Sequence, residues 1–426
     1  MILISKTYWG GAPFHFRRKP RDAQVESLVL RAADFREFRA LYWTPRARPR
    51  PRTAVVVMHP RVDFTHHYCI PRLVDAGFGV LAANTRNPNN DVDTVHEEIV
   101  LDVAAAVAFV RNHRGVERVV LFGNSGGGSL MALYQAQASQ PPADRIASAP
   151  CGAPTRLATA DMPPADGLVF VACHRGQGHV LAQCIDPAVV DEENPLATDP
   201  ALDMYDPANG FRPPPQWCEY DDTFVARYRA AQLDRVRRLD ARARALIAGA
   251  ADARAAVGAA GDLPDAARRR LERRAAFEPV MVVYRTMANL HYVDRHLDPS
   301  DRDYGSLLSE RPDLMNYQRL GFARVVTPRA WLSTWSALSS NADLVRNIAR
   351  IREPTLLAFA GRDREIYPRT DAEPIAAAAG ADDQTVLRFP GARHYFEPAE
   401  PGARDAPDVD ALMDAVVPWI RERFSA

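Results

Sequence analysis

Short runs of apolar, often β-branched residues recur along the first part of the chain, and segments with helical periodicity separate them. Edge strands are expected at 26–31 and 38–43, and buried strands at 54–58, 79–83, 118–122 and 167–172. Helices are expected at 94–112 and 129–138, where the pattern is helical. Helical crossovers between strands make the strands parallel. The alternation therefore predicts an α/β fold with a mostly parallel central sheet and helices on both faces.

The composition is that of an ordinary folded protein. Of 426 residues, 47% are hydrophobic and 25% are charged, which argues against the disordered, collagen-like and coiled-coil classes. The 53 basic residues balance the 53 acidic residues, so no net charge draws the chain toward nucleic acid or an anionic membrane. We therefore expect neither a nucleic-acid nor a membrane partner.

The cysteines and the hydropathy pattern predict a cytoplasmic location. Five cysteines without a C-x-x-C pair suit reduced thiols better than a disulfide framework. The N-terminal segment MILISKTYWGG lacks the basic leader, apolar run and cleavage site of a secretory signal. No segment reaches about 18 uninterrupted apolar residues, the length that a membrane span requires.

The strand–helix alternation stops after residue 172 and resumes with a strand at 354–359. Because this interval is too long for a connecting loop, we expect an inserted subdomain over 173–345. The core would then consist of residues 1–172 and 346–426.

The clearest element of the expected insertion is a helix over 222–250, with an apolar face and many arginines around it. A nucleic-acid surface is the alternative for these arginines, but Asp234, Asp240 and Asp252 interrupt the positive charge. We therefore favour a solvated helix. A last strand over 385–389 and a closing helix over 409–424 are expected to complete the core.

The pentapeptide Gly123-Asn124-Ser125-Gly126-Gly127 lies directly between an expected strand and an expected helix. At such a sharp turn a nucleophile has strained backbone geometry, and its neighbours two residues away are glycines because a Cβ would collide with adjacent chain. Ser125 would project from the C-terminal edge of the sheet. The N–H of Gly126, at the start of the helix, would face an oxyanion there.

A glycine-rich turn can also bind phosphate or simply connect two elements. A phosphate loop requires G-x-x-x-x-G-K-[ST], and this segment has no Lys. A dinucleotide loop requires G-x-G-x-x-G, and Gly123-Asn124-Ser125 breaks that pattern. We therefore expect no cofactor.

A serine hydroxyl needs a base to remove its proton, so an acid and then a histidine are expected downstream, each on a loop after a strand. Asp363 and His394 occupy such loops. His394 would take the proton from Ser125 and deliver it to the leaving group, while Asp363 would orient the imidazole. Glu365 is the competing acid, and Asp363 alone would also suit a turn or a helix cap.

Through this pentapeptide and the loops with Asp363 and His394, the chain resembles the α/β-hydrolases over about 25–172 and 350–426. The resemblance implies the α/β-hydrolase fold and a serine hydrolase of the esterase type. It also implies a large, mainly helical cap, because in that family the cap usually enters after the sixth strand.

In the α/β-hydrolases the loop after the third strand supplies a second oxyanion donor. The chain has His59-Pro60-Arg61 in that loop. Pro60 has no N–H, so the resemblance implies the backbone of Arg61 as the donor beside Gly126, with Val62 as the alternative.

The expected substrate pocket is bordered by His59, His174, Trp331 and Trp335. The two tryptophans either form a pocket wall for an apolar or aromatic acyl group or pack beneath the cap. Histidines also cluster at 66–67 and 174–179, but neither group has spacing typical of metal ligands. We therefore expect no metal.

Together these patterns predict a serine hydrolase that cleaves a small-molecule carboxylic ester through an acyl-enzyme. A thioesterase, an amidase or peptidase and a C–C bond hydrolase share the same triad and stay open. A ligand-binding receptor that keeps the fold without turnover is the alternative outside enzymes. The sequence leaves a homo-oligomer open.

Overall fold

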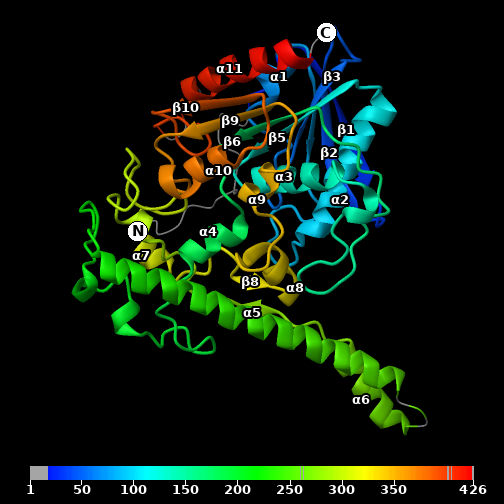
Figure 1. Ribbon diagram of the computed structural model, residues 1–426. Coiled ribbons are helices and arrows are strands. Elements are labelled where there is room, and N and C mark those ends of the chain that lie inside the picture. Colours follow the sequence, from blue (N-terminus) through cyan, green and yellow to red (C-terminus); the bar gives the residue numbers. More distant parts are fainter. Residues whose placement is uncertain (1–17, 260, 262, 401–402, 404, 425–426) are drawn as a thin grey trace.

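In the computed structural model, eight strands form one sheet within the described residues 18–259, 261, 263–400, 403 and 405–424 (Figure 1). In sheet order these strands are β1 (Ala23–Arg31), β2 (Glu37–Pro45), β4 (Gly79–Ala83), β3 (Thr53–Val57), β5 (Arg118–Asn124), β6 (Gly167–Val171), β9 (Thr355–Ala360) and β10 (Gln384–Phe389). β2 is antiparallel to both of its neighbours, and all the other neighbours are parallel. The N-terminal segment in which no secretory leader is expected lies outside the described residues.

Helices cover both faces of the sheet because the side chains of its strands alternate between two apolar layers. Ala54 and Val56 of β3 contribute to one layer, and Val55 and Val57 contribute to the other. The first layer packs against α2 (His96–Ala108), α3 (Gly127–Ala138), α9 (Leu344–Ile348) and α10 (Glu373–Ala378), and the second against α1 (Ile70–Asp75) and α11 (Pro407–Phe424). Figure 1 shows α1 and α11 together on one side of the sheet and α2 and α3 on the other. The predicted α/β class with a mostly parallel sheet is confirmed.

The chain between β6 and α9, here called the inserted segment, builds a layer of its own. It contains α4 (Gln177–Cys184), α5 (Asp222–Gly258), α6 (Asp265–Ala275), α7 (Pro312–Met315), α8 (Pro328–Ala330) and the antiparallel pair β7 (Met281–Val282) and β8 (Val325–Val326). Buried apolar clusters within this segment, including Tyr228, Tyr292 and Trp331, give it its own core.

Helix α5 is the longest element of the inserted segment and exceeds the expected range 222–250. Its N-terminus is capped by Asp221, whose side chain accepts from Phe224 N. Its C-terminal half extends away from the body of the molecule together with α6 (Figure 1). The buried residues of α5 lie mainly between Phe224 and Ala243, so only the first part of the helix covers the rest of the inserted segment.

Polar groups at the N-terminus of α2 attach the inserted segment to the sheet layer. The carboxylate of Glu97 accepts a hydrogen bond from Ser333 Oγ at 2.6 Å and one from Asn341 Nδ2 at 2.9 Å. The neighbouring residue His96 also contacts the inserted segment, since its Nδ1 lies 2.9 Å from Thr334 Oγ1. These buried bonds fix the chain that follows α8 over the C-terminal edge of the sheet.

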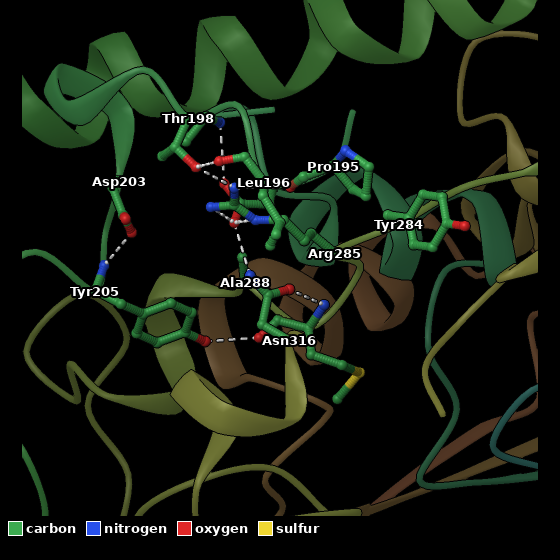
Figure 2. Close-up of polar contacts among 12 residues, drawn as sticks. Pro195, Leu196, Thr198, Asp203, Tyr205, Tyr284, Arg285, Ala288 and Asn316 are labelled. Atoms are coloured by element: carbon green, nitrogen blue, oxygen red, sulfur yellow. Dashed lines mark hydrogen bonds and ion pairs between the residues drawn. The ribbon is translucent and has the colours of Figure 1, made fainter. Parts of the chain in front are cut away.

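A buried ion pair organises the irregular part of the inserted segment (Figure 2). Arg285 Nε donates to Asp186 Oδ2 at 2.9 Å, and Arg285 Nη1 donates to Thr198 Oγ1 at 2.6 Å. Asn316 Nδ2 donates to the same Asp186 oxygen at 2.7 Å. Arg285 and Asp186 are almost fully buried, so each charge depends on the other for compensation.

We predict that Arg285→Ala lowers the free energy of unfolding by about 3–5 kcal/mol, because it leaves the Asp186 carboxylate buried without its partner. Urea denaturation of the variant measures the loss. The control is the double variant Asp186→Leu with Arg285→Met, which removes both charges and is expected to cost less than Arg285→Ala alone. Equal stability of Arg285→Ala and the unmodified protein would show that the pair has no such role.

Candidate active site

Ser125 lies at the turn that joins β5 to α3, at the C-terminal edge of the sheet. Its backbone has a φ of 54°, a left-handed conformation that is uncommon for a residue with a side chain. Ser125 N donates to Val171 O of the neighbouring strand β6 at 3.0 Å. The strained turn is therefore held in place by the sheet.

The glycines around Ser125 are required by close contacts with backbone. A Cβ built on Gly123 would lie 2.8 Å from backbone atoms of Gly127 and Gly128, and one built on Gly127 would lie 2.6 Å from Met58 O. These distances are too short for any larger residue without a backbone shift. They account for the spacing Gly-x-Ser-x-Gly in physical terms.

Asn124, immediately before Ser125, stabilises the turn through polar contacts of its side-chain amide. Its Oδ1 accepts from Tyr68 OH at 2.9 Å and contacts His67 Nε2 at 3.0 Å. Its Nδ2 donates to Val171 O at 2.8 Å. Sequence reasoning missed this role, although a fully buried amide at the end of an apolar strand was a signal for it.

The structure brings Ser125, His394 and Asp363 together. His394 Nε2 lies 2.9 Å from Ser125 Oγ, and His394 Nδ1 lies 2.8 Å from Asp363 Oδ2. The exposed fractions of the three residues are 6%, 3% and 1% in the same order. Because an ionised carboxylate only accepts, Nδ1 carries the ring proton and Nε2 accepts from the serine hydroxyl.

Asp363 is oriented by the loop that carries it. Its other oxygen, Oδ1, accepts from Glu365 N at 2.8 Å and from Ile366 N at 3.1 Å. Burial would lower the pKa of His394, but the charge and hydrogen bond of Asp363 outweigh burial, so the pKa of His394 is raised above its ordinary 6.5. The carboxylate therefore stabilises the protonated imidazole.

The competing acid Glu365 does not hydrogen-bond to His394. Its carboxyl accepts from Tyr292 OH and from Leu307 N of the inserted segment, both at 2.8 Å. Burial raises the pKa of Glu365 to about 7, against the lowering effect of these two donors. Glu365 thus connects the core loop to the inserted segment beside Ser125.

Backbone N–H groups at the start of α3 are free of intrahelical acceptors, as at any helix N-terminus, and Gly126 is the N-cap of that helix. The expected second donor is arranged differently. Arg61 N donates to His59 Nδ1 at 3.2 Å, and the alternative, Val62 N, donates to the same atom at 3.0 Å. Both N–H groups therefore donate to the side chain of His59 and do not face a substrate. This corrects the expectation that Arg61 N–H is the second oxyanion donor.

A small cavity of about 40 Å³ opens above Ser125. It is lined by His59, Arg61, Ser125, His174, Gln177, Val180, Leu307, Leu308, Phe322, Trp335, Glu365 and His394. Three of the four expected pocket residues therefore border it. The exception is Trp331, whose Nε1 donates to Asp240 Oδ1 at 2.7 Å in the core of the inserted segment. Trp331 therefore packs within the inserted segment, which was the alternative to a place in the pocket wall.

Gln177 is a cavity residue that the sequence did not single out. It is the first residue of α4, and its Oε1 accepts from Ser129 Oγ at 3.3 Å. A Cβ built on Gly126 would lie 2.1 Å from Gln177 Nε2. The signal available in the sequence was its place shortly after a sheet strand, where side chains reach the C-terminal edge.

No three His, Cys, Asp or Glu side chains among the described residues form a group that could hold a metal ion. No helix there is both long enough and apolar enough to cross a membrane.

We predict that kcat/KM for the preferred substrate falls as pH is lowered through the pKa of His394. Protonated His394 cannot accept the proton of Ser125, and its pKa is raised above 6.5, so the midpoint is expected above that value. Because the pKa of Glu365 is about 7, its titration falls in the same pH range. The profile is therefore also measured for Glu365→Gln, in which that titration is absent. A profile that is flat from pH 5 to 8 in both proteins would contradict the assignment of His394 as the base.

The chain is similar in structure to a hypothetical protein from Pseudomonas aeruginosa, at 14% identity and a TM-score of 0.48 over 100% of both chains. It is also similar to Est1E from Butyrivibrio proteoclasticus, at 9% identity and a TM-score of 0.45 over 94% of this chain and 99% of that chain. No family model and no curated protein sequence matches the chain.

The fold is assigned from the topology of the chain itself. The sheet is mostly parallel, with antiparallel pairing confined to the pairs β1–β2 and β2–β4 at one edge. Ser125 lies on the turn from β5 to α3, and the acid and histidine follow it on loops after β9 and β10. A strand–serine–helix turn with the chain order Ser, Asp, His is the arrangement of the α/β-hydrolases. The chain therefore has the α/β-hydrolase fold.

Proposed function

We propose that the protein is a serine hydrolase that cleaves a carboxylic ester. The proposal is carried by the hydrogen-bonded series from Asp363 through His394 to Ser125, with both distances below 3 Å.

In the proposed reaction Ser125 Oγ attacks the ester carbonyl while His394 Nε2 takes its proton. The resulting oxyanion accepts a hydrogen bond from Gly126 N–H at the start of α3. His394 then gives the proton to the leaving alcohol, and an acyl-enzyme remains. Water, activated by the same imidazole, attacks the acyl carbon and releases the acid.

The lining of the cavity favours a small substrate with an apolar group. Val180, Leu307, Leu308, Phe322 and Trp335 form the apolar part of the wall. We propose a small-molecule ester as the partner and a cap role for residues 173–345, which supply all of these apolar side chains.

The cytoplasmic location is part of the same proposal. All five cysteines lie among the described residues, and all are free. Free thiols are typical of a reducing compartment.

The test compares p-nitrophenyl esters of increasing acyl length, acyl-thioesters and aryl amides as substrates. Preference for esters supports the proposal, and preference for thioesters or amides assigns one of the alternatives that share the triad. A fluorophosphonate probe, followed by peptide mass spectrometry, is expected to label Ser125. Absence of both turnover and labelling would favour a ligand-binding receptor with this fold.

A further inference from the structure

The imidazole of His59 has a tautomer that its surroundings determine. Arg61 N and Val62 N donate to His59 Nδ1 at 3.2 and 3.0 Å. A nitrogen that accepts two N–H groups carries no proton itself. In the neutral ring the proton is therefore on Nε2, which makes Nε2 a hydrogen-bond donor.

The ring is also held neutral. His59 is 4% exposed. Burial lowers its pKa well below the usual value, and the positive charge of Arg61 lowers the pKa further. The side chain is therefore a neutral N–H donor across the pH range in which His394 works as a base.

The donor atom of His59 is directed toward the start of α3. A Cβ built on Gly126 would lie 2.9 Å from His59 Nε2. His59, Ser125 and His394 line the same cavity. Among the described residues Nε2 has no hydrogen-bond acceptor of its own, so a polar group of a substrate can use it.

We propose that His59 Nε2–H is the second oxyanion donor, opposite Gly126 N–H, in place of the backbone N–H expected from Arg61. The inference rests on the proposed function. His59 keeps its proton throughout, since it only donates a hydrogen bond to the oxygen that becomes negative when Ser125 attacks. A neutral imidazole can act as an electrophile of this kind, and Arg61 N and Val62 N orient it.

Two substitutions separate the donor role of His59 from its support of the loop. In His59→Asn the short side chain can still accept from Arg61 N and Val62 N, but the Nε2 donor is gone. In His59→Gln the longer amide can reach the position of Nε2, but the acceptor near the loop is lost. We expect His59→Asn to lower kcat by about 10²–10³-fold, with KM changed by less than about 3-fold. His59→Gln is expected to have a kcat at least about 10-fold above that of His59→Asn, by restoring one such donor.

A second readout reports on the oxyanion directly. A trifluoromethyl ketone that forms a tetrahedral adduct with Ser125 is expected to bind His59→Asn more weakly, by about the factor that kcat/KM falls. His113→Asn, the same change at an exposed histidine, is the matched control, and thermal unfolding is recorded for every variant.

The outcomes are distinguishable from a failure of the proposed function. A kcat of His59→Asn within about 5-fold of the unmodified protein, or a kcat of His59→Gln below that of His59→Asn, overturns the donor role. In both cases Ser125-dependent hydrolysis persists. If the unmodified protein neither hydrolyses esters nor reacts with the fluorophosphonate, the proposed function fails and the donor role falls with it.

Discussion

Ser125→Ala is expected to reduce ester hydrolysis by about 10⁶-fold in kcat, to a level set by binding and by the oxyanion donors alone. The reason is that the hydroxyl 2.9 Å from His394 Nε2 is the proposed nucleophile, which the imidazole activates by taking its proton. Steady-state rates with the preferred ester, together with loss of fluorophosphonate labelling, measure the effect. Residual activity near that of the unmodified protein would refute the nucleophile assignment.

The substitution is not expected to unfold the protein. The unusual backbone of Ser125, with a φ of 54°, is retained by alanine, and the N–H bond to Val171 O does not depend on the side chain. Thermal unfolding within a few degrees of the unmodified protein is therefore expected. Ser139→Ala, at the exposed C-terminal end of the same helix α3, is the matched control and should leave both rate and stability unchanged.

Local patterns predicted the sheet and the contacts around Ser125. The central strands β3, β4 and β6 are short apolar runs, and the pattern identified them because burial on both faces leaves little freedom of composition. The glycines beside Ser125 are set by backbone contacts within a few residues, such as that of Gly127 with Met58 O. Chain order and loop position were then sufficient to indicate Asp363 and His394.

Features that depend on how particular side chains are placed in three dimensions were not predictable. Whether Arg61 N–H faces a substrate is decided by the ring of His59, two residues away, which the motif alone does not place. Trp331 and Trp335 lie one helical turn apart, and the contact of Trp331 with Asp240, 91 residues earlier, decides which of them faces the cavity.

The inserted segment depends on pairs such as Arg285 with Asp186, which are separated by 99 residues and carry no local signal.

The two candidate acids, Asp363 and Glu365, are expected to respond very differently to removal of their charge. Asp363→Asn is expected to lower kcat by about 10⁴-fold, because an amide no longer holds His394 in the tautomer with its proton on Nδ1. It should also lower the pKa of His394, since the charge that raises this pKa is lost. The acidic limb of the pH profile should move to lower pH in the residual activity.

Glu365→Gln is expected to lower kcat by about 10-fold at most, which corresponds to the loss of one ordinary hydrogen bond of about 1.4 kcal/mol. Its carboxyl contacts Tyr292 OH and Leu307 N rather than the imidazole, and an amide oxygen can still accept from one of them. Because Glu365 has a pKa of about 7, a large fraction of the molecules already have a neutral carboxyl group at pH 7. The neutral amide of Gln resembles that protonated carboxyl group. Rates and pH profiles of the two variants, measured side by side, show which residue is the acid. A larger loss of kcat for Glu365→Gln than for Asp363→Asn would mean that Glu365 orients His394 during turnover. The loop that carries both residues would then have to rearrange.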